Sequence, residues 1–157
     1  MSGKFTGTAS QILVRSRSWA ALLAWDSRTS AMSCPWMTGE PGQNLDWIGG
    51  WHLSPRDQVA VADVNGDGHD EVFIRSPSWA GLLAGSGSGL TSWLVQQANV
   101  GNWNLNPFDN ALPLRRPGGT DLFLHHPWGW TAAVQVSGTG PSATIALTSA
   151  QFREIVA

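Results

Sequence analysis

The chain has 157 residues and a formal net charge of −2, from 11 acidic and 9 basic side chains. This length suits one domain, and the charge leaves no basic surface for nucleic acid or a membrane. The single cysteine excludes an intrachain disulfide and a cysteine-based metal cluster. No apolar stretch reaches the ~20 residues of a membrane-spanning helix, and MSGKFTGTAS at the N-terminus has no signal-peptide core. We therefore expect neither nucleic acid nor a membrane as a partner. We expect the protein to be located in the cytoplasm, or outside the cell after non-classical secretion.

Three segments of the chain resemble one another: LVRSRSWAALLAW (13–25), FIRSPSWAGLLAG (73–85) and FLHHPWGWTAAVQ (123–135). Such self-similarity is the signature of a repeat architecture. The alignment places Trp19, Trp79 and Trp130 in one column. It also places three side chains with ring or guanidinium nitrogens in a second column, which are Arg15, Arg75 and His125.

A second alignment pairs GGWHLSPRDQVAV (49–61) with GNWNLNPFDNALP (101–113). Here Trp51 matches Trp103, and Asp57 matches Asp109. The two segments follow the first and second units, so a GxW element ends each of these units.

Each unit is predicted to form about four short strands. In chain order the clearest are QILVR and WAALLAW, then EVFIR and WAGLLAG, then DLFLH and WTAAVQV, all bounded by Gly, Pro, Asn, Asp or Ser. The fold class is therefore all-β. Units of ~50 residues with four strands favour a β-propeller built from three blade-like repeats in one domain, approximately 1–62, 63–114 and 115–157. A β-trefoil, or another threefold β fold, is the alternative.

An acidic loop, DVNGDGHDE (63–71), precedes the second of these strands. Crowded carboxylates are stabilised by a cation, and calcium takes six to eight oxygen ligands. Alternate positions of the loop carry Asp63, Asn65, Asp67 and Glu71, and its glycines permit the tight curvature that such ligation requires. An EF-hand is excluded because it needs a bidentate Glu at position 12, where this chain has Ile74.

The segment VAVADVNGDGHDEVFIRS (59–76) resembles the FG-GAP/VCBS repeat, the calcium-loop blade of integrin-like β-propellers. The resemblance implies that Asp63, Asn65, Asp67 and Glu71 bind calcium through side chains and that His69 contributes its carbonyl. The matching loops KFTGTASQ (4–11) and RRPGGTD (115–121) have lost most of the acids. We therefore expect one structural calcium ion per chain.

Three blades do not close a ring, because propellers typically have about four to eight. An open array exposes an unpaired edge, which symmetric self-association would cover. A homodimer with six blades is the favoured assembly. The alternative is that the chain is a fragment of a longer propeller.

The repeated tryptophans suggest a function. An indole ring offers a flat face for a sugar, and neighbouring cationic or imidazole groups offer polar contacts. The candidate ligand-binding residues are Trp19, Trp79, Trp130, Arg15, Arg75 and His125. Some propellers of the resembled family are lectins, so the expected function is non-catalytic carbohydrate binding. A core role for the same tryptophan column remains open, and a calcium-stabilised protein–protein interaction module is the alternative function. No acid–base pair suggests an enzyme.

Overall fold

The computed structural model describes residues 1–7, 9–16, 18–39, 44–100, 103–117, 119–137 and 144–151. These residues form sixteen β-strands. No helix in this part of the chain is long and apolar enough to cross a membrane. The prediction of an all-β fold is confirmed.

Twelve of the strands form three four-stranded sheets, called blades 1, 2 and 3, in which each strand pairs antiparallel with its neighbour in the chain. Blade 1 contains β1 (Ser2–Gly3), β2 (Gln11–Arg15), β3 (Ala20–Asp26) and β4 (Ala31–Met37). Blade 2 contains β7 (Gln58–Ala62), β8 (Glu71–Arg75), β9 (Trp79–Ser86) and β10 (Gly89–Gln97). Blade 3 contains β13 (Asn110–Arg116), β14 (Gly119–His126), β15 (Trp130–Ser137) and β16 (Thr144–Gln151).

A short hairpin follows each of the first two blades. The first consists of β5 (Trp47–Ile48) and β6 (Trp51–His52), and the second of β11 (Asn99–Val100) and β12 (Trp103–Asn104). These hairpins are the GxW elements of the sequence.

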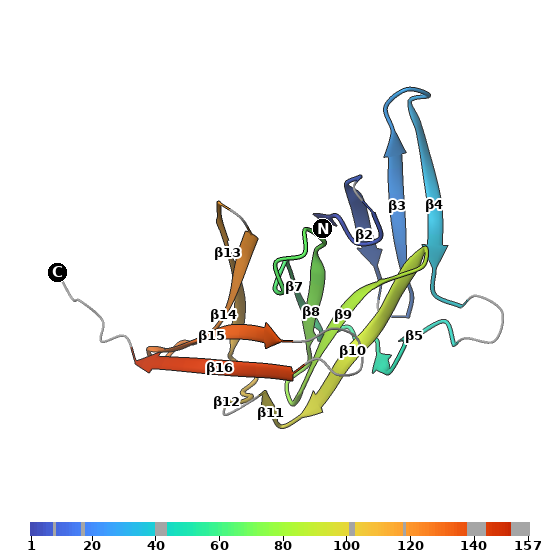
Figure 1. Cartoon of the computed structure of the whole chain (residues 1–157). Helices are drawn as coiled ribbons and strands as arrows, with labels where there is room; N and C mark the ends of the chain where they lie inside the picture. The colour runs from blue at the N-terminus through green and yellow to red at the C-terminus, as the bar shows by residue number, and fades with distance from the viewer. Residues whose placement is uncertain are drawn as a thin grey trace.

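The three blades follow one another in space as they do in the chain, with blade 2 between blades 1 and 3 (Figure 1). The first strand of blade 2, β7, contacts both β1 and β13. This is the blade arrangement of a β-propeller, as the repeats predicted, although the described strands form no closed ring. The division predicted after residue 62 lies between β7 and β8, so the sequence repeat and the sheet are offset by one strand.

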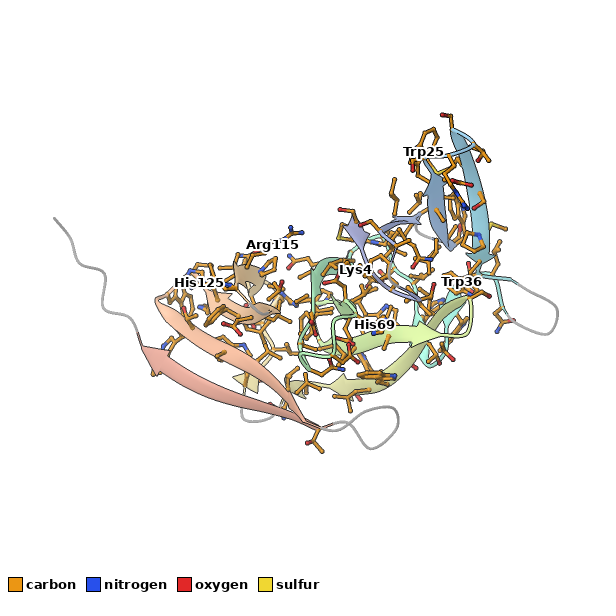
Figure 2. The ribbon with its side chains drawn as sticks, turned by 45° about the horizontal axis from the view of Figure 1, so that its top comes forward. Lys4, Trp25, Trp36, His69, Arg115 and His125 are labelled. Carbon is orange, nitrogen blue, oxygen red and sulfur yellow. The ribbon has the colours of Figure 1, made fainter. Side chains whose placement is uncertain are left out.

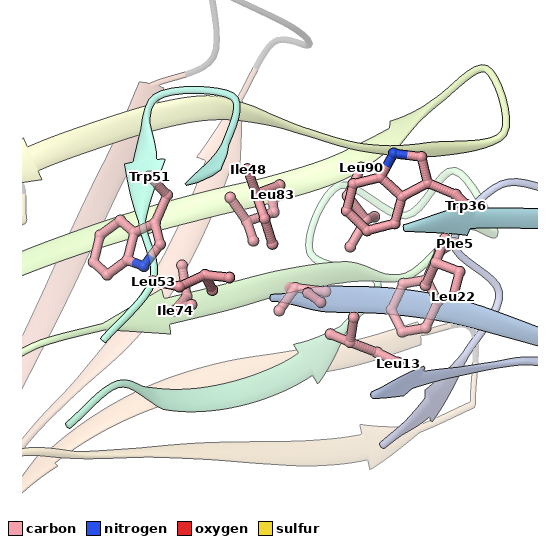
Figure 3. Packing of buried hydrophobic residues seen from close by; sticks show 12 residues of the cluster. Phe5, Leu13, Leu22, Trp36, Ile48, Trp51, Leu53, Ile74, Leu83 and Leu90 are labelled. Atoms are coloured by element: carbon pink, nitrogen blue, oxygen red, sulfur yellow. The ribbon is translucent and has the colours of Figure 1, made fainter. Parts of the chain in front are cut away.

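One apolar cluster joins blades 1 and 2, and we call it the first joint. Blade 1 contributes Leu13, Leu22 and Trp36, whose side chains face the hairpin and blade 2 (Figure 3). The hairpin and the residue after it contribute three buried side chains, which are Ile48, Trp51 and Leu53. Blade 2 contributes Val72, Ile74, Leu83 and Leu90.

A second cluster, the second joint, connects blades 2 and 3 in the same way. Phe73 and Ala80 of blade 2 meet Trp103 of the second hairpin and Leu122 and Leu124 of blade 3. Because blade 2 takes part in both joints, every residue of β8 is buried, whichever face its side chain occupies. Burying one large aliphatic side chain contributes about 1.5–3 kcal/mol, so the joints are what hold the blades together.

Trp51 also explains a glycine in blade 2. A Cβ atom at Gly81 would lie 2.7 Å from Cε3 of Trp51. Only glycine allows the indole to approach the β9 backbone this closely.

Each buried hairpin tryptophan is held by an aspartate six residues later. Trp51 Nε1 donates to Asp57 Oδ2 at 3.0 Å, and the Ser54 amide donates to the same oxygen at 2.8 Å. Asp57 is buried, and this burial raises the pKa of its carboxyl, while the hydrogen bond from Trp51 opposes the shift. The guanidinium of Arg15 donates to the backbone carbonyls of Ser54 and Asp57.

The same arrangement recurs at the second joint. Trp103 Nε1 donates to Asp109 Oδ2 at 2.7 Å, and the Asn106 amide donates to that oxygen at 2.9 Å. Arg75 donates to the backbone carbonyls of Asn106, at 2.7 Å, and of Asp109. We call each set a Trp–Asp–Arg clamp, and each clamp ties one blade to the loop that enters the next.

Candidate functional site

The tryptophan column predicted from the sequence lies at the surface. Trp79 is 39% exposed and Trp130 is 45% exposed, while Trp19 is half-buried. Trp19 and Trp79 each stand at the end of a tight turn. The Ser16 amide donates to the Trp19 carbonyl, and the Ser76 amide donates to the Trp79 carbonyl. The column is therefore outside both apolar clusters, and the core role left open by the sequence falls to Trp51 and Trp103 instead.

The structure places the neighbouring cationic column elsewhere. Arg75 is only 1% exposed, and its guanidinium faces the loop of the second clamp. Burial lowers the pKa of Arg75, an effect that the charge of Asp109 opposes. Arg15 has the corresponding contacts in the first clamp. The third member, His125, hydrogen-bonds Thr131 Oγ1 through Nδ1 at 3.0 Å. These contacts give the two arginines a structural role, so they are not brought together with the exposed tryptophans as ligand groups.

A pocket of about 550 Å³ opens beside Trp79, between the first hairpin and the turn that connects β8 to β9. Its lining comes from three segments and is mixed in character: Trp47, Gly50, Trp51, His52, Ser54, Arg56, Ser76, Pro77, Ser78, Trp79 and Val95.

The hairpin side of this pocket is formed by a stacked pair of rings. Trp47 and His52 are cross-strand partners in the hairpin, with ring centroids 4.9 Å apart and an interplanar angle of 26°. Asp46 Oδ2 lies 2.8 Å from Nε2 of His52 and fixes the imidazole. The pocket thus combines flat aromatic surfaces, an imidazole, a guanidinium and serine hydroxyls, which is a chemistry suited to a polar ligand with an apolar face.

The sequence alone did not identify Trp47, His52 or Arg56 as candidate site residues. Trp47 has no aromatic counterpart in the second hairpin, where the equivalent residue is Asn99, and Phe108 stands in place of Arg56. A search based on repetition cannot find residues that do not repeat. The available signal was position, since all three flank the GxW element.

A larger hollow of about 710 Å³ adjoins the first and shares Trp47 with it. It lies over the turn between β9 and β10, and none of the described residues that line it is charged. Half of its lining residues are glycine or serine, so we regard the Trp79 pocket, which adds an imidazole and a guanidinium, as the better-equipped site.

Blade 3 has its own surface aromatic group around Trp130. Trp128, in the turn before it, is 79% exposed and meets the ring of His126 edge-on at 4.9 Å. Trp128 is an additional residue in this turn compared with the turn of blade 2. This group shares the tryptophan column with the Trp79 pocket but differs from it in shape.

The acidic loop lies between β7 and β8, where its side chains bind its own backbone. Asp63 accepts from the amides of Gly66 and Gly68, at 2.8 and 3.0 Å, and Asp67 accepts from the His69 amide at 2.8 Å. Gly66 and Gly68 have φ values of 76° and 87°, the left-handed conformations that the sequence predicted for them. The loop also contacts the N-terminal segment, because the amide of Asp70, the residue after His69, donates to the Lys4 carbonyl at 2.9 Å (Figure 2).

Glu71 is the buried acid of this loop. It is 2% exposed, accepts from the Val64 amide at 3.1 Å and is approached by the side-chain amide of Asn65 at 3.3 Å. Burial, reinforced by the charges of Asp67, Asp63 and Asp70, raises its pKa to about 8. A carboxylate in this environment would gain from a neighbouring cation.

The loop fits calcium by the chemistry of its donors, which are carboxylate and amide oxygens. Its side chains are not arranged as a finished metal site, since no group of three or more His, Cys, Asp or Glu among the described residues is placed to hold an ion. The five predicted ligand residues therefore lie together in one loop, and calcium binding remains a prediction.

A model of the FG-GAP repeat family matches residues 56–90, which run from the end of the first clamp to the start of β10. The matched segment includes the acidic loop and most of blade 2. No curated protein matches the chain. This part of the chain matches the FG-GAP repeat, as its resemblance predicted, and the three blades give the described residues a β-propeller-like architecture.

Proposed function

We propose that this protein is a non-catalytic carbohydrate-binding protein and that its best-formed sugar site is the pocket beside Trp79. The observation that carries the proposal is the exposed indole of Trp79, which faces the same pocket of about 550 Å³ as His52 and Arg56. An indole face stacks on the C–H face of a pyranose, while imidazole, guanidinium and hydroxyl groups bond its hydroxyls.

Repetition of the tryptophan column supports the proposal. Trp19, Trp79 and Trp130 lie at or beside the start of the third strand of successive blades, so related shallow sites would face one way around the propeller. Several weak sites on one rigid body gain avidity when they engage a surface that carries many copies of a sugar.

We also propose that one calcium ion per chain stabilises the loop of blade 2. Asp63, Asn65, Asp67 and Glu71 would hold it through side-chain oxygens and His69 through its carbonyl. The match to the FG-GAP repeat and the raised pKa of Glu71 support this assignment. The ion would supply charge neutralisation and would tie the entry of β8 to the end of β7.

The second candidate function is recognition of a protein by the same calcium-stabilised module. The FG-GAP match favours it, because such repeats are found in propeller-like interaction modules. Under this alternative the aromatic side chains around Trp128 and Trp130 would form part of a protein interface.

A glycan array probed with labelled protein, in calcium and again in EDTA, tests the proposal. We expect binding to a coherent set of sugars, and we expect Trp79→Ala to lose at least tenfold in affinity for them. Trp128→Ala is the matched control, because it removes a more exposed indole from a different blade.

A folded protein that binds no glycan would favour the protein-interaction function. Loss of binding in Trp128→Ala with retention in Trp79→Ala would move the site from blade 2 to blade 3.

A further inference from the structure

Blade 1 has an apolar face that the described residues of the chain leave partly open. In β2 and β3 the side chains that point away from the first joint include Ile12, Val14 and Leu23, and Met37 of β4 lies on the same face. Ile12 is 40% exposed and Met37 is 46% exposed. Leu13 and Leu22 point the opposite way, into the first joint. Both faces of this sheet are therefore apolar, as expected of a sheet packed on both sides.

The repeat identifies what this face is built to meet. Ile12 and Leu23 are register partners in blade 1, just as Val72 and Leu83 are in blade 2. In blade 2 this face is covered by the first joint, and neither Val72 nor Leu83 is exposed. The open face of blade 1 is thus equivalent to the face of blade 2 that packs against the preceding blade. We call it the receiving face.

Blade 3 exposes the opposite half of such a joint. Leu112 and Leu114 of β13 are 47% and 57% exposed, and Leu112 is the register partner of Phe123. Their counterparts in blade 2 are Ala60 and Ala62, which are buried in the second joint. This open face of blade 3 is the one with which a blade packs on its successor, and we call it the donating face.

The two open faces lie at opposite ends of the array. Trp25, on the tip of the receiving blade, and His125, on the donating blade, are on opposite sides of the molecule in Figure 2. One chain therefore presents both halves of a joint without bringing them together.

We propose that the donating face of blade 3 packs against the receiving face of blade 1 in a second copy of this chain. Two such joints, related by a twofold axis, would close a ring of six blades, which is within the range of about four to eight found in propellers. The second copy is favoured because the faces are unlike each other and each corresponds to the strand part of one half of a joint that the chain already forms. Neither joint within the chain pairs two receiving faces or two donating faces.

Sedimentation equilibrium of the intact chain, with substitutions on each face, tests this inference. We expect the unchanged protein to sediment at about twice 16.8 kDa. Ile12→Asp on the receiving face and Leu114→Asp on the donating face should each give a mass of 16.8 kDa. Either change places a charge in both of the joints that would connect the two copies. Phe108→Asp is the matched control, since Phe108 is 67% exposed but lies in the clamp loop, and its mass should stay doubled.

The outcomes separate this assembly from others. A monomer at all concentrations, or an assembly of three or more copies, overturns the proposal. If only one of the two face variants dissociates, like faces pair with like, and the proposal is also overturned. Circular dichroism shows whether each variant is folded, and Met37→Asp replaces Ile12→Asp if that variant is not.

Discussion

The two tryptophan columns of this chain look alike in sequence and differ in place. Trp51 and Trp103 are buried at 3% and 9% exposure, and each donates its indole N–H to an aspartate six residues later. Trp79 and Trp130 are 39% and 45% exposed and begin strands β9 and β15 at the blade surface. The first column joins blades, whereas the second is free to meet a ligand.

Repetition by itself therefore does not distinguish a core tryptophan from a surface tryptophan. What distinguishes the columns is the partner of the indole nitrogen, because a buried N–H must be hydrogen-bonded. The W-x5-D spacing marks the buried column, and no aspartate follows Trp79 or Trp130 at that distance.

Breaking a clamp should have the largest effect on stability. Asp109→Ala leaves the buried N–H of Trp103 without its acceptor and removes the negative charge beside the buried Arg75. We expect the free energy of unfolding to fall by about 3 kcal/mol, measured by urea denaturation. Asp46→Ala is the control, since its pair with His52 is exposed and should be worth at most about 1 kcal/mol. If the two variants lost equal free energy of unfolding, the clamp would contribute no more to stability than an exposed ion pair.

Calcium should stabilise the loop of blade 2 and not the matching loops of blades 1 and 3, which lack most of the acids. An ion at a hundred times its dissociation constant stabilises a protein by about 2.7 kcal/mol. We therefore expect the melting temperature to rise by several degrees in calcium relative to EDTA, and Asp67→Ala to abolish that difference. A melt that is the same in both buffers would contradict the proposed ion.

The metal-free protein should lose stability as pH rises. The pKa of Glu71 is raised from 4.5 to about 8, so the folded protein keeps a proton there that the unfolded chain has lost. Between these values unfolding releases that proton, and stability falls by at most about 1.4 kcal/mol per pH unit. The test is urea denaturation in EDTA at several pH values. Glu71→Gln should remove most of this slope, and a slope that survives unchanged would mean that another group titrates.

The smallest stability effect is expected at the surface column. Trp79→Ala should change the free energy of unfolding by no more than about 0.5 kcal/mol, since the side chain is exposed and outside both joints. Thermal melting of this variant beside the unchanged protein measures it. A large destabilisation would assign Trp79 to the structure of the blade instead of to a ligand.

The sequence sufficed for the features that recur. The similarity of the segments that begin at Leu13, Phe73 and Phe123 identified equivalent strands, and the FG-GAP segment indicated the blade type. The arginine column could not be interpreted in the same way. Arg15 and Arg75 recur because each holds the loop of the next blade, and that contact spans 31 to 42 residues of chain. A long-range contact between a strand and a loop leaves no local pattern.

The pocket was less accessible to prediction than the fold. Trp79 was found because it repeats. Trp47 and His52 belong to the first hairpin, where their rings stack on each other and line the pocket. The cross-strand register that brings them together depends on how the hairpin turns at Gly49, where φ is 55°. Their shared position flanking a GxW element is the only sign that the sequence offers.

The proposed function requires that the surface column binds sugar and that the buried column does not. The most direct test is a ¹H–¹⁵N spectrum of the indole groups, titrated with galactose, glucose, fucose and N-acetylglucosamine. We predict that at least one sugar shifts the resonance of Trp79 while those of Trp51 and Trp103 stay in place. Shifts confined to the buried pair, or none with any of these sugars or with a glycan selected by the array, would contradict the account.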